Sequence, residues 1–352
     1  MTRPLETLRN FVRSALDTQG VYLGRSLDRL GLPIASLREE EVEHCAFADS
    51  FLPLAIEGRF DDLVAAFEVE STAATLMSDG LAVHAIVADI LNGAVDPAAM
   101  SRAECERALP QVADWWNASD RSANAAAVLG LALARTALAC ERPQLTDLWL
   151  SADPERADHY RAVAMEVLTE SEPLAAGCRL WARNRYEAAA ALAASPVETA
   201  RRFQAALAFD TYDVSLYLMR TRHLLASKES ATRDIETFAR ASLARTRDRF
   251  GAMLYARVHL SAARFVPLET LDPDRRLLLD GLDDWLQRFP SQFLANQFAS
   301  IAHWARDLER VKELFRSHIR EIHIDAWRDA SQPYLAWEEA GLAPSRQKGN
   351  VG

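Results

Sequence analysis

The stretch EGRFDDLVAAFE, residues 57–68, decides the fold class of this chain. Its apolar residues Leu63, Ala66 and Phe67 recur at the spacing of one helical face. Gly58 is the second residue of the stretch and precedes its apolar residues. A residue without a Cβ permits close backbone approach at the point where a first helix ends. The stretch therefore predicts a helical hairpin.

The hairpin fits one unit of a repeat. Residues 43–77 can be read against the tetratricopeptide register of about 34 residues, in which two antiparallel helices pack through large and small positions. That register places Phe47 and Leu54 inward on the first helix, and Leu63 and Phe67 inward on the second. Pro53 lies inside the first helix and should kink it.

Further units repeat this pattern. Residues 196–210 place Phe203 and Leu207 on one apolar stripe, and residues 289–319 form another pair of predicted helices. Short polar or proline-bearing turns separate the remaining helical blocks, so we expect about 15–18 helices in consecutive hairpins. The alternation at residues 322–324 is too short to outweigh a helical reading.

Together these patterns predict an all-α fold of consecutive helical hairpins, arranged as a tetratricopeptide-like α-solenoid or superhelical array. We expect an N-terminal helical segment at residues 1–36. A helical-hairpin array with an acidic N-terminal part should follow at residues 37–195, and an Arg-rich array that ends in a C-terminal cap at residues 196–342. Residues 343–352 should form a disordered tail.

The composition is typical of a folded helical protein. Of the 352 residues, 49% are hydrophobic and 26% are charged, and the chain holds only 13 Gly and 14 Pro. The net charge of -10 argues against nucleic acid as a partner, because like charges repel and no counterions are released.

Cysteine spacing and hydropathy bear on the compartment. The four cysteines, at residues 45, 105, 140 and 178, are too far apart for a C-x-x-C redox or zinc pair, which favours a reducing compartment. The N-terminal stretch carries charges throughout and shows no secretory signal. No apolar run approaches the about 18 residues of a membrane span. We therefore expect a cytoplasmic protein of bacterial type with no membrane partner.

Several blocks carry a family resemblance: WWNASDRSANAA (residues 115–126), FQAALAFD (203–210), ETFAR (236–240) and FPSQFLANQFASIAHWARD (289–307). In these blocks the chain resembles an uncharacterised family of bacterial all-helical, tetratricopeptide-like proteins, known only as a domain of unknown function. Such proteins tend to have a Trp-Gly-Gly-Ser segment ahead of the Phe-Ala-Arg block, whereas this chain reads LLASKESATRDIETFAR (224–240). The resemblance implies the fold and no activity.

No motif predicts catalysis. The chain has no G-x-S-x-G elbow for a nucleophile and no closely spaced glycines to cradle phosphates. We interpret the possible metal ligands as side chains that pair on solvated helix surfaces. We therefore expect no catalytic residue, no cofactor and no metal. These candidates are Glu40 with His44, His303 with Asp307, and His318 with Glu321 and His323.

Charge is segregated along the chain. Residues 201–276 carry 14 Lys and Arg against 9 Asp and Glu, whereas residues 38–70 carry 10 acidic and 2 basic residues. Arginines seven residues apart lie near one helical face, and guanidinium groups grip carboxylates or phosphates bidentately. The alternative is that these arginines pair with nearby acids or cover apolar surface. The candidate partner-binding residues are Arg233, Arg240, Arg247, Arg257 and Arg264.

We favour a non-catalytic protein–protein interaction scaffold or adaptor that binds a protein or peptide on a helical-repeat surface. One alternative is an acidic inhibitory or immunity-type partner of a basic protein, for which the acidic residues 38–70 are the cue. The other is an enzyme whose site is assembled from distant residues, with a metal near His303, His318 or His44.

Overall fold

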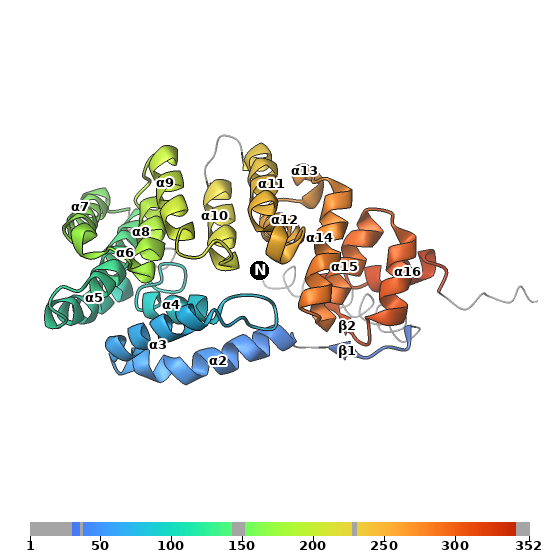
Figure 1. Cartoon of the computed structure of the whole chain (residues 1–352), viewed down its shortest axis with the longest axis horizontal. Helices are drawn as coiled ribbons and strands as arrows, with labels where there is room; N and C mark the ends of the chain where they lie inside the picture. Colours follow the sequence, from blue (N-terminus) through green and yellow to red (C-terminus); the bar gives the residue numbers. More distant parts are fainter. Residues whose placement is uncertain (1–29, 36–37, 143–151, 227–230, 343–352) are drawn as a thin grey trace, which may run out of the picture. The chain divides into compact units, whose positions relative to one another are not determined.

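The structure of the protein is a computed structural model, which describes residues 30–35, 38–142, 152–226 and 231–342 (Figure 1). It is 74% helical, with 16 α-helices among the described residues and almost no strand. The all-α prediction is confirmed. The expected segment at residues 1–36 lies largely outside the described residues, and the expected tail at 343–352 lies wholly outside them.

Contacts divide the chain into two compact units, which we call the large unit and the small unit. The large unit is Glu43–Pro273, and it begins within helix α2 (Glu39–Ile56). The boundary expected at residues 195 and 196 falls inside this unit, between two helices that pack together. The other elements of the large unit are α3 (Phe60–Ala73), α4 (Val83–Asn92), α5 (Arg102–Ala118), α6 (Ala123–Glu141), α7 (Pro154–Glu170), η1 (Glu172–Leu174), α8 (Arg179–Ala191), α9 (Pro196–Leu207), α10 (Val214–Ala226), α11 (Ala231–Phe250), α12 (Met253–Ala263) and α13 (Leu268–Leu271).

The small unit comprises the described residues before Glu43 and those from Asp274 onward. Its elements are β1 (Ile34–Ala35), α14 (Arg275–Arg288), α15 (Gln292–Trp304), α16 (Leu308–Ser317), β2 (Ile322–His323), η2 (Ile324–Ala326) and α17 (Gln332–Glu339).

Local sequence signals set where many of these helices begin. Helix α5 starts with a capping box, in which Ser101 accepts from the N–H of Glu104 and the Glu104 side chain accepts from the N–H of Ser101. Helices α7 and α9 start with a proline after an Asp or Ser cap, where the missing N–H has no helical partner to lose. These signals explain why helix positions are readable from the sequence.

The hairpin of the opening stretch is present. Gly58 has a φ of 71°, which an L side chain rarely adopts, and it stands between α2 and α3 as predicted. Leu63 and Phe67 are fully buried, and Phe47 and Leu54 are partly buried against the same core. The inward face of this hairpin was therefore predicted correctly.

Helix α6 lies at the centre of the large unit's core. It packs against α5, α7 and α8, and a Cβ added at its Gly130 would lie 2.5 Å from Cγ of Leu168 on α7. By length and apolar composition α6 could cross a membrane, so the expectation that no apolar run reaches such a length is wrong. In the fold, 78% of its apolar window is buried, as in a core helix.

The even-numbered helices of the large unit follow one another in space. Helix α4 contacts α6, α6 contacts α8, α8 contacts α10, and α10 contacts α12. Each is also in contact with at least one odd-numbered neighbour in the chain, such as α3, α5, α9 or α11 (Figure 1).

The small unit contains a short parallel pairing of β1 with β2, in which Ile34 stands opposite Ile322. The helical reading is therefore wrong for Ile322 and His323, whereas Ile324 begins the 3₁₀ helix η2. The N–H of Ile322 donates to the main-chain O of Pro33 at 2.8 Å, and the buried Asn296 of α15 donates to the main-chain O of Glu321 at 2.9 Å. Distant residues thus satisfy the backbone groups that a helix would have satisfied locally.

Candidate functional site

Helix α8 buries an unusual set of polar side chains. Its sequence reads RLWARNRYEAAAA, and it packs against α6, α9 and α10. Polar groups removed from water need partners within the protein, so we expect a cluster of interacting polar side chains around this helix. The polar side chains of α8 that are exposed by 5% or less are those of Arg183, Asn184, Arg185 and Tyr186.

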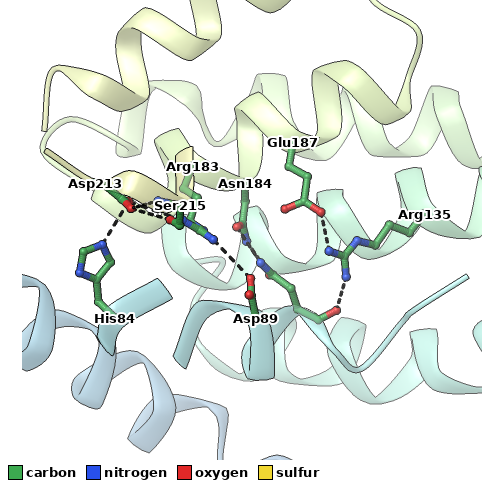
Figure 2. Close-up of polar contacts among 9 residues, drawn as sticks. His84, Asp89, Arg135, Arg183, Asn184, Glu187, Asp213 and Ser215 are labelled. Carbon is green, nitrogen blue, oxygen red and sulfur yellow. Dashed lines mark hydrogen bonds and ion pairs between the residues drawn. The ribbon is translucent and has the colours of Figure 1, made fainter. Parts of the chain in front are cut away.

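Arg183 is the centre of the network in Figure 2. Its Nη1 donates to Oγ of Ser215 at 2.6 Å and lies 3.5 Å from Oδ2 of Asp213. Its Nη2 lies 3.3 Å from Oδ1 of Asp89 on α4. One buried guanidinium group from α8 therefore joins α4 to the start of α10, and its charge is balanced by carboxylates on both sides.

Asp213 and His84 form a second buried pair. Oδ2 of Asp213 lies 3.2 Å from Nε2 of His84, and the residues are 4% and 1% exposed. Burial alone would raise the pKa of Asp213, but the hydrogen bond from His84 and the charge of Arg183 outweigh it and lower the pKa to about 2. Asp213 is therefore a carboxylate at neutral pH.

An amide pair and a further arginine extend the network. Asn92 of α4 and Asn184 of α8 each donate to the other, at 2.9 and 2.8 Å. Arg135 of α6 donates to the main-chain O of Asn92 at 2.7 Å and pairs with Glu187 of α8 (Figure 2). The network thus connects α4, α6, α8 and the start of α10.

Asp89 lies where the network meets solvent. Its side chain is 69% exposed. The pKa of Asp89 is raised, first because surrounding protein atoms desolvate the carboxylate and then because of the charge of Glu187, while Arg183 opposes the rise. Water reaches this carboxylate and screens its interactions, so the shifted pKa contributes little to stability.

The network lacks the parts of a hydrolytic triad. Such a triad needs a nucleophile against the ring nitrogen that the aspartate leaves free. Nδ1 of His84 is buried and has no hydrogen-bond partner among the described residues, and the hydroxyl of Ser215 donates to Asp213 instead. The contacts of this network therefore connect α4, α8 and the start of α10.

Four of the five predicted partner-binding arginines are exposed. Arg233, Arg240 and Arg247 lie on α11, and Arg264 is the residue that ends α12. Arg240 pairs with Glu236, as the alternative interpretation expected.

Arg257 is placed differently. It is 4% exposed, its Nη1 donates to the main-chain O of Asp79 at 2.6 Å, and its Nη2 lies 3.6 Å from Oδ2 of the same residue. The structure therefore does not bring Arg257 to the surface with Arg264, although both were predicted to lie near one helical face.

Several of the candidate metal ligands contact one neighbouring group each. No group of three or more His, Cys, Asp or Glu side chains among the described residues could hold a metal ion. Asp307 accepts from the N–H of Arg310 as the cap of α16. The distances from histidine Nε2 to the nearest carboxylate oxygen are 3.5 Å for His44 with Asp79, 3.0 Å for His303 with Glu339, and 3.2 Å for His323 with Glu321.

Sequence reasoning missed the α8 network entirely. The signal it leaves is the run Trp181–Glu187, in which three polar side chains stand between aromatic residues ahead of four alanines. Small residues on the remaining turns let neighbouring helices approach from several sides, so the polar residues are covered as well.

Comparisons of the chain with protein-family models, with curated proteins and with solved structures return no match. The resemblance to an uncharacterised family accordingly stays a prediction.

Proposed function

We propose that the chain is a non-catalytic binding protein that holds an acidic segment of a protein partner against exposed arginines of α11. The observation that carries this proposal is the row Arg233, Arg240 and Arg247, which recurs every seventh residue on one exposed face of a single helix. Arginine grips carboxylates bidentately, so such a row suits a partner with acidic side chains.

Two of these guanidinium groups are available to a partner. The guanidinium groups of Arg233 and Arg247 make no ion pair or hydrogen bond with another residue of the described chain, and that of Arg264 at the end of α12 makes none either. The network around Arg183 and Asn184 of α8, by contrast, is engaged with other residues of the protein. This contrast supports binding at the surface over chemistry in the interior.

The contacts between helices support a repeat-like frame for that surface. A row in which α4, α6, α8, α10 and α12 follow one another, with odd-numbered helices packed against it, is the arrangement expected of a tetratricopeptide-like array. Helix α11 belongs to the odd-numbered set and packs against α10 and α12. Its arginines would then lie on the face that the row of even-numbered helices does not cover.

A binding titration tests the proposal. The probe is a fluorescent 15-residue peptide rich in Glu, with a Gln-substituted peptide for comparison, and the measurement is anisotropy at several salt concentrations. We expect the wild type to bind only the Glu peptide, more weakly as salt rises. The double substitution Arg233→Glu with Arg247→Glu should abolish binding. Arg240 is left unchanged because Glu236, which it holds, also accepts from Tyr255.

The matched control changes the same charges elsewhere. Arg276 and Arg306 have side-chain exposures of 92% and 72%, and both lie in the small unit. The variant Arg276→Glu with Arg306→Glu should bind as the wild type does. If the wild type does not bind the Glu peptide, or if both double variants lose binding equally, the arginines of α11 are not the binding surface. The inhibitory or immunity-type function and the dispersed enzyme site stay predictions.

A further inference from the structure

Among the described residues, Arg185 is a buried arginine without a counter-ion. It is 5% exposed, its Nε has no hydrogen-bond partner in the described part of the chain, and its Nη1 contacts Sδ of Met165 at 4.0 Å. A thioether sulfur is a weak acceptor. The other arginines buried among the described residues, Arg183, Arg202 and Arg257, each pair with at least one carboxylate.

The two acids whose charges act on Arg185 are paired with other arginines. Glu172 of η1 accepts from Arg202 at 2.9 Å, and Glu198 of α9 accepts from Arg202 at 2.7 Å and from Arg201 at 2.8 Å. Three guanidinium groups therefore share two carboxylates, and one positive charge is left over at the buried end of the cluster. Burial lowers the pKa of Arg185, and the charge of Arg202 lowers it further.

The geometry points to an oxyanion site at Arg185, where a carboxylate or phosphate group of a small molecule accepts from the unused guanidinium N–H groups between α7, α8 and α9. An oxyanion fits the fork of a guanidinium group and would restore neutrality to the cluster. A buried charge that lacks a partner is costly, which gives an anion a favourable free energy of entry.

Met165 contacts both Arg185 and solvent. Its side chain is 41% exposed while its sulfur contacts the guanidinium group, so one residue both covers Arg185 and meets water. Methionine is unbranched and adapts its shape readily, so it can move aside for a small anion. This site lies on α8 and is independent of the binding surface proposed on α11.

Thermal unfolding of the full chain tests the inference. Sodium phosphate and sodium acetate are titrated in separate series, with ionic strength held constant by sodium chloride. We expect the unfolding midpoint of the wild type to rise saturably with phosphate, because a ligand that binds only the folded state stabilises it. In Arg185→Met the response should vanish. Arg201→Met, which removes an exposed charge from the same cluster, should retain it.

A second measurement does not depend on an Arg185 variant that folds. The wild type, labelled with ¹³C at its methionine methyl groups, is titrated with the same anions, and Met165→Leu assigns the Met165 signal. That signal should shift saturably, and the response to each anion tells whether phosphate groups alone or carboxylates also bind. The inference is overturned if neither anion shifts the Met165 signal, or if Arg185→Met responds as the wild type does.

Discussion

Arg257 and Asp79 lie 178 positions apart in the sequence, yet the guanidinium group of one is held by both the main chain and the carboxylate of the other. Their contact ties α12 to the segment between α3 and α4. That segment also turns back on itself, since the N–H of Met77 donates to the main-chain O of Leu81 at 2.8 Å. One ion pair with a buried guanidinium group thus links α12 to a segment of the large unit that lies far away in the sequence.

Replacement of Arg257 should destabilise the large unit strongly. Arg257→Met keeps the volume but removes the guanidinium group that faces Asp79, and loss of one member of a buried pair costs about 3 kcal/mol. Urea unfolding followed by circular dichroism measures the change. Arg264→Met, at the exposed end of the same helix, should alter the free energy of unfolding by no more than about 0.5 kcal/mol. Equal effects of the two variants would contradict a special role for the buried pair.

Gly130 should tolerate no side chain. In Gly130→Ala the new Cβ would lie 2.5 Å from Cγ of Leu168, so α6 and α7 must separate or Leu168 must leave its rotamer. We expect a loss of about 1–3 kcal/mol in the free energy of unfolding. Combination with Leu168→Ala should cost less than the sum of the two single changes, because the removed atoms free the space that the alanine needs. Strict additivity would show that the clash is relieved elsewhere.

Asp213 should make the fold sensitive to acid. Its pKa is near 3.8 when unfolded and about 2 when folded, so its contribution is complete above about pH 4 and is lost as the pH falls towards 2. The pKa difference corresponds to about 2 kcal/mol. In Asp213→Asn the unfolding free energy should be lower at pH 7 and should fall less steeply between pH 4 and 2. Asp89→Asn, whose carboxyl has a raised pKa, should not flatten the profile in this way.

His223 should make the free energy of unfolding depend on pH over a higher range than Asp213 does. Its Nδ1 lies 2.8 Å from the hydroxyl of Tyr186, and burial lowers its pKa from 6.5 to about 4. Between these values the unfolded chain binds the proton more tightly, so stability falls as the pH drops from about 6.5 to 4. His223→Gln should remove this part of the pH dependence, which amounts to at most about 3 kcal/mol. Urea midpoints at half-unit pH steps test this, and a profile unchanged below pH 6.5 would contradict it.

Local patterns were enough to predict the helices. The spacing of Leu63 and Phe67 identified the buried face of α3, and the apolar stripe predicted at residues 196–210 coincides with α9. Both kinds of information lie within a few residues of the helix concerned. For that reason the all-α class and most helix positions could be predicted without any knowledge of packing.

The candidate site could not be predicted in the same way. His84 and Asp213 are separated by 129 positions, and Asn92 and Asn184 by 92, so no local spacing connects them. A helix that contains Arg, Asn and Glu reads as solvated when only its own residues are considered. The same holds for Arg257. Its separation of seven residues from Arg264 could be read from the sequence, whereas its contact with the distant Asp79 could not.

The reciprocal amides of Asn92 and Asn184 constrain how this protein can change over evolutionary time. One inserted or deleted residue between Arg179 and Asn184 would rotate every later side chain by about 100° around the helix axis. Asn184 would then face away from Asn92, and Glu187 away from Arg135, with buried donors left unpaired. Length variation among descendants of this chain should therefore gather in the inter-helix turns, while the residue count of α8 stays fixed.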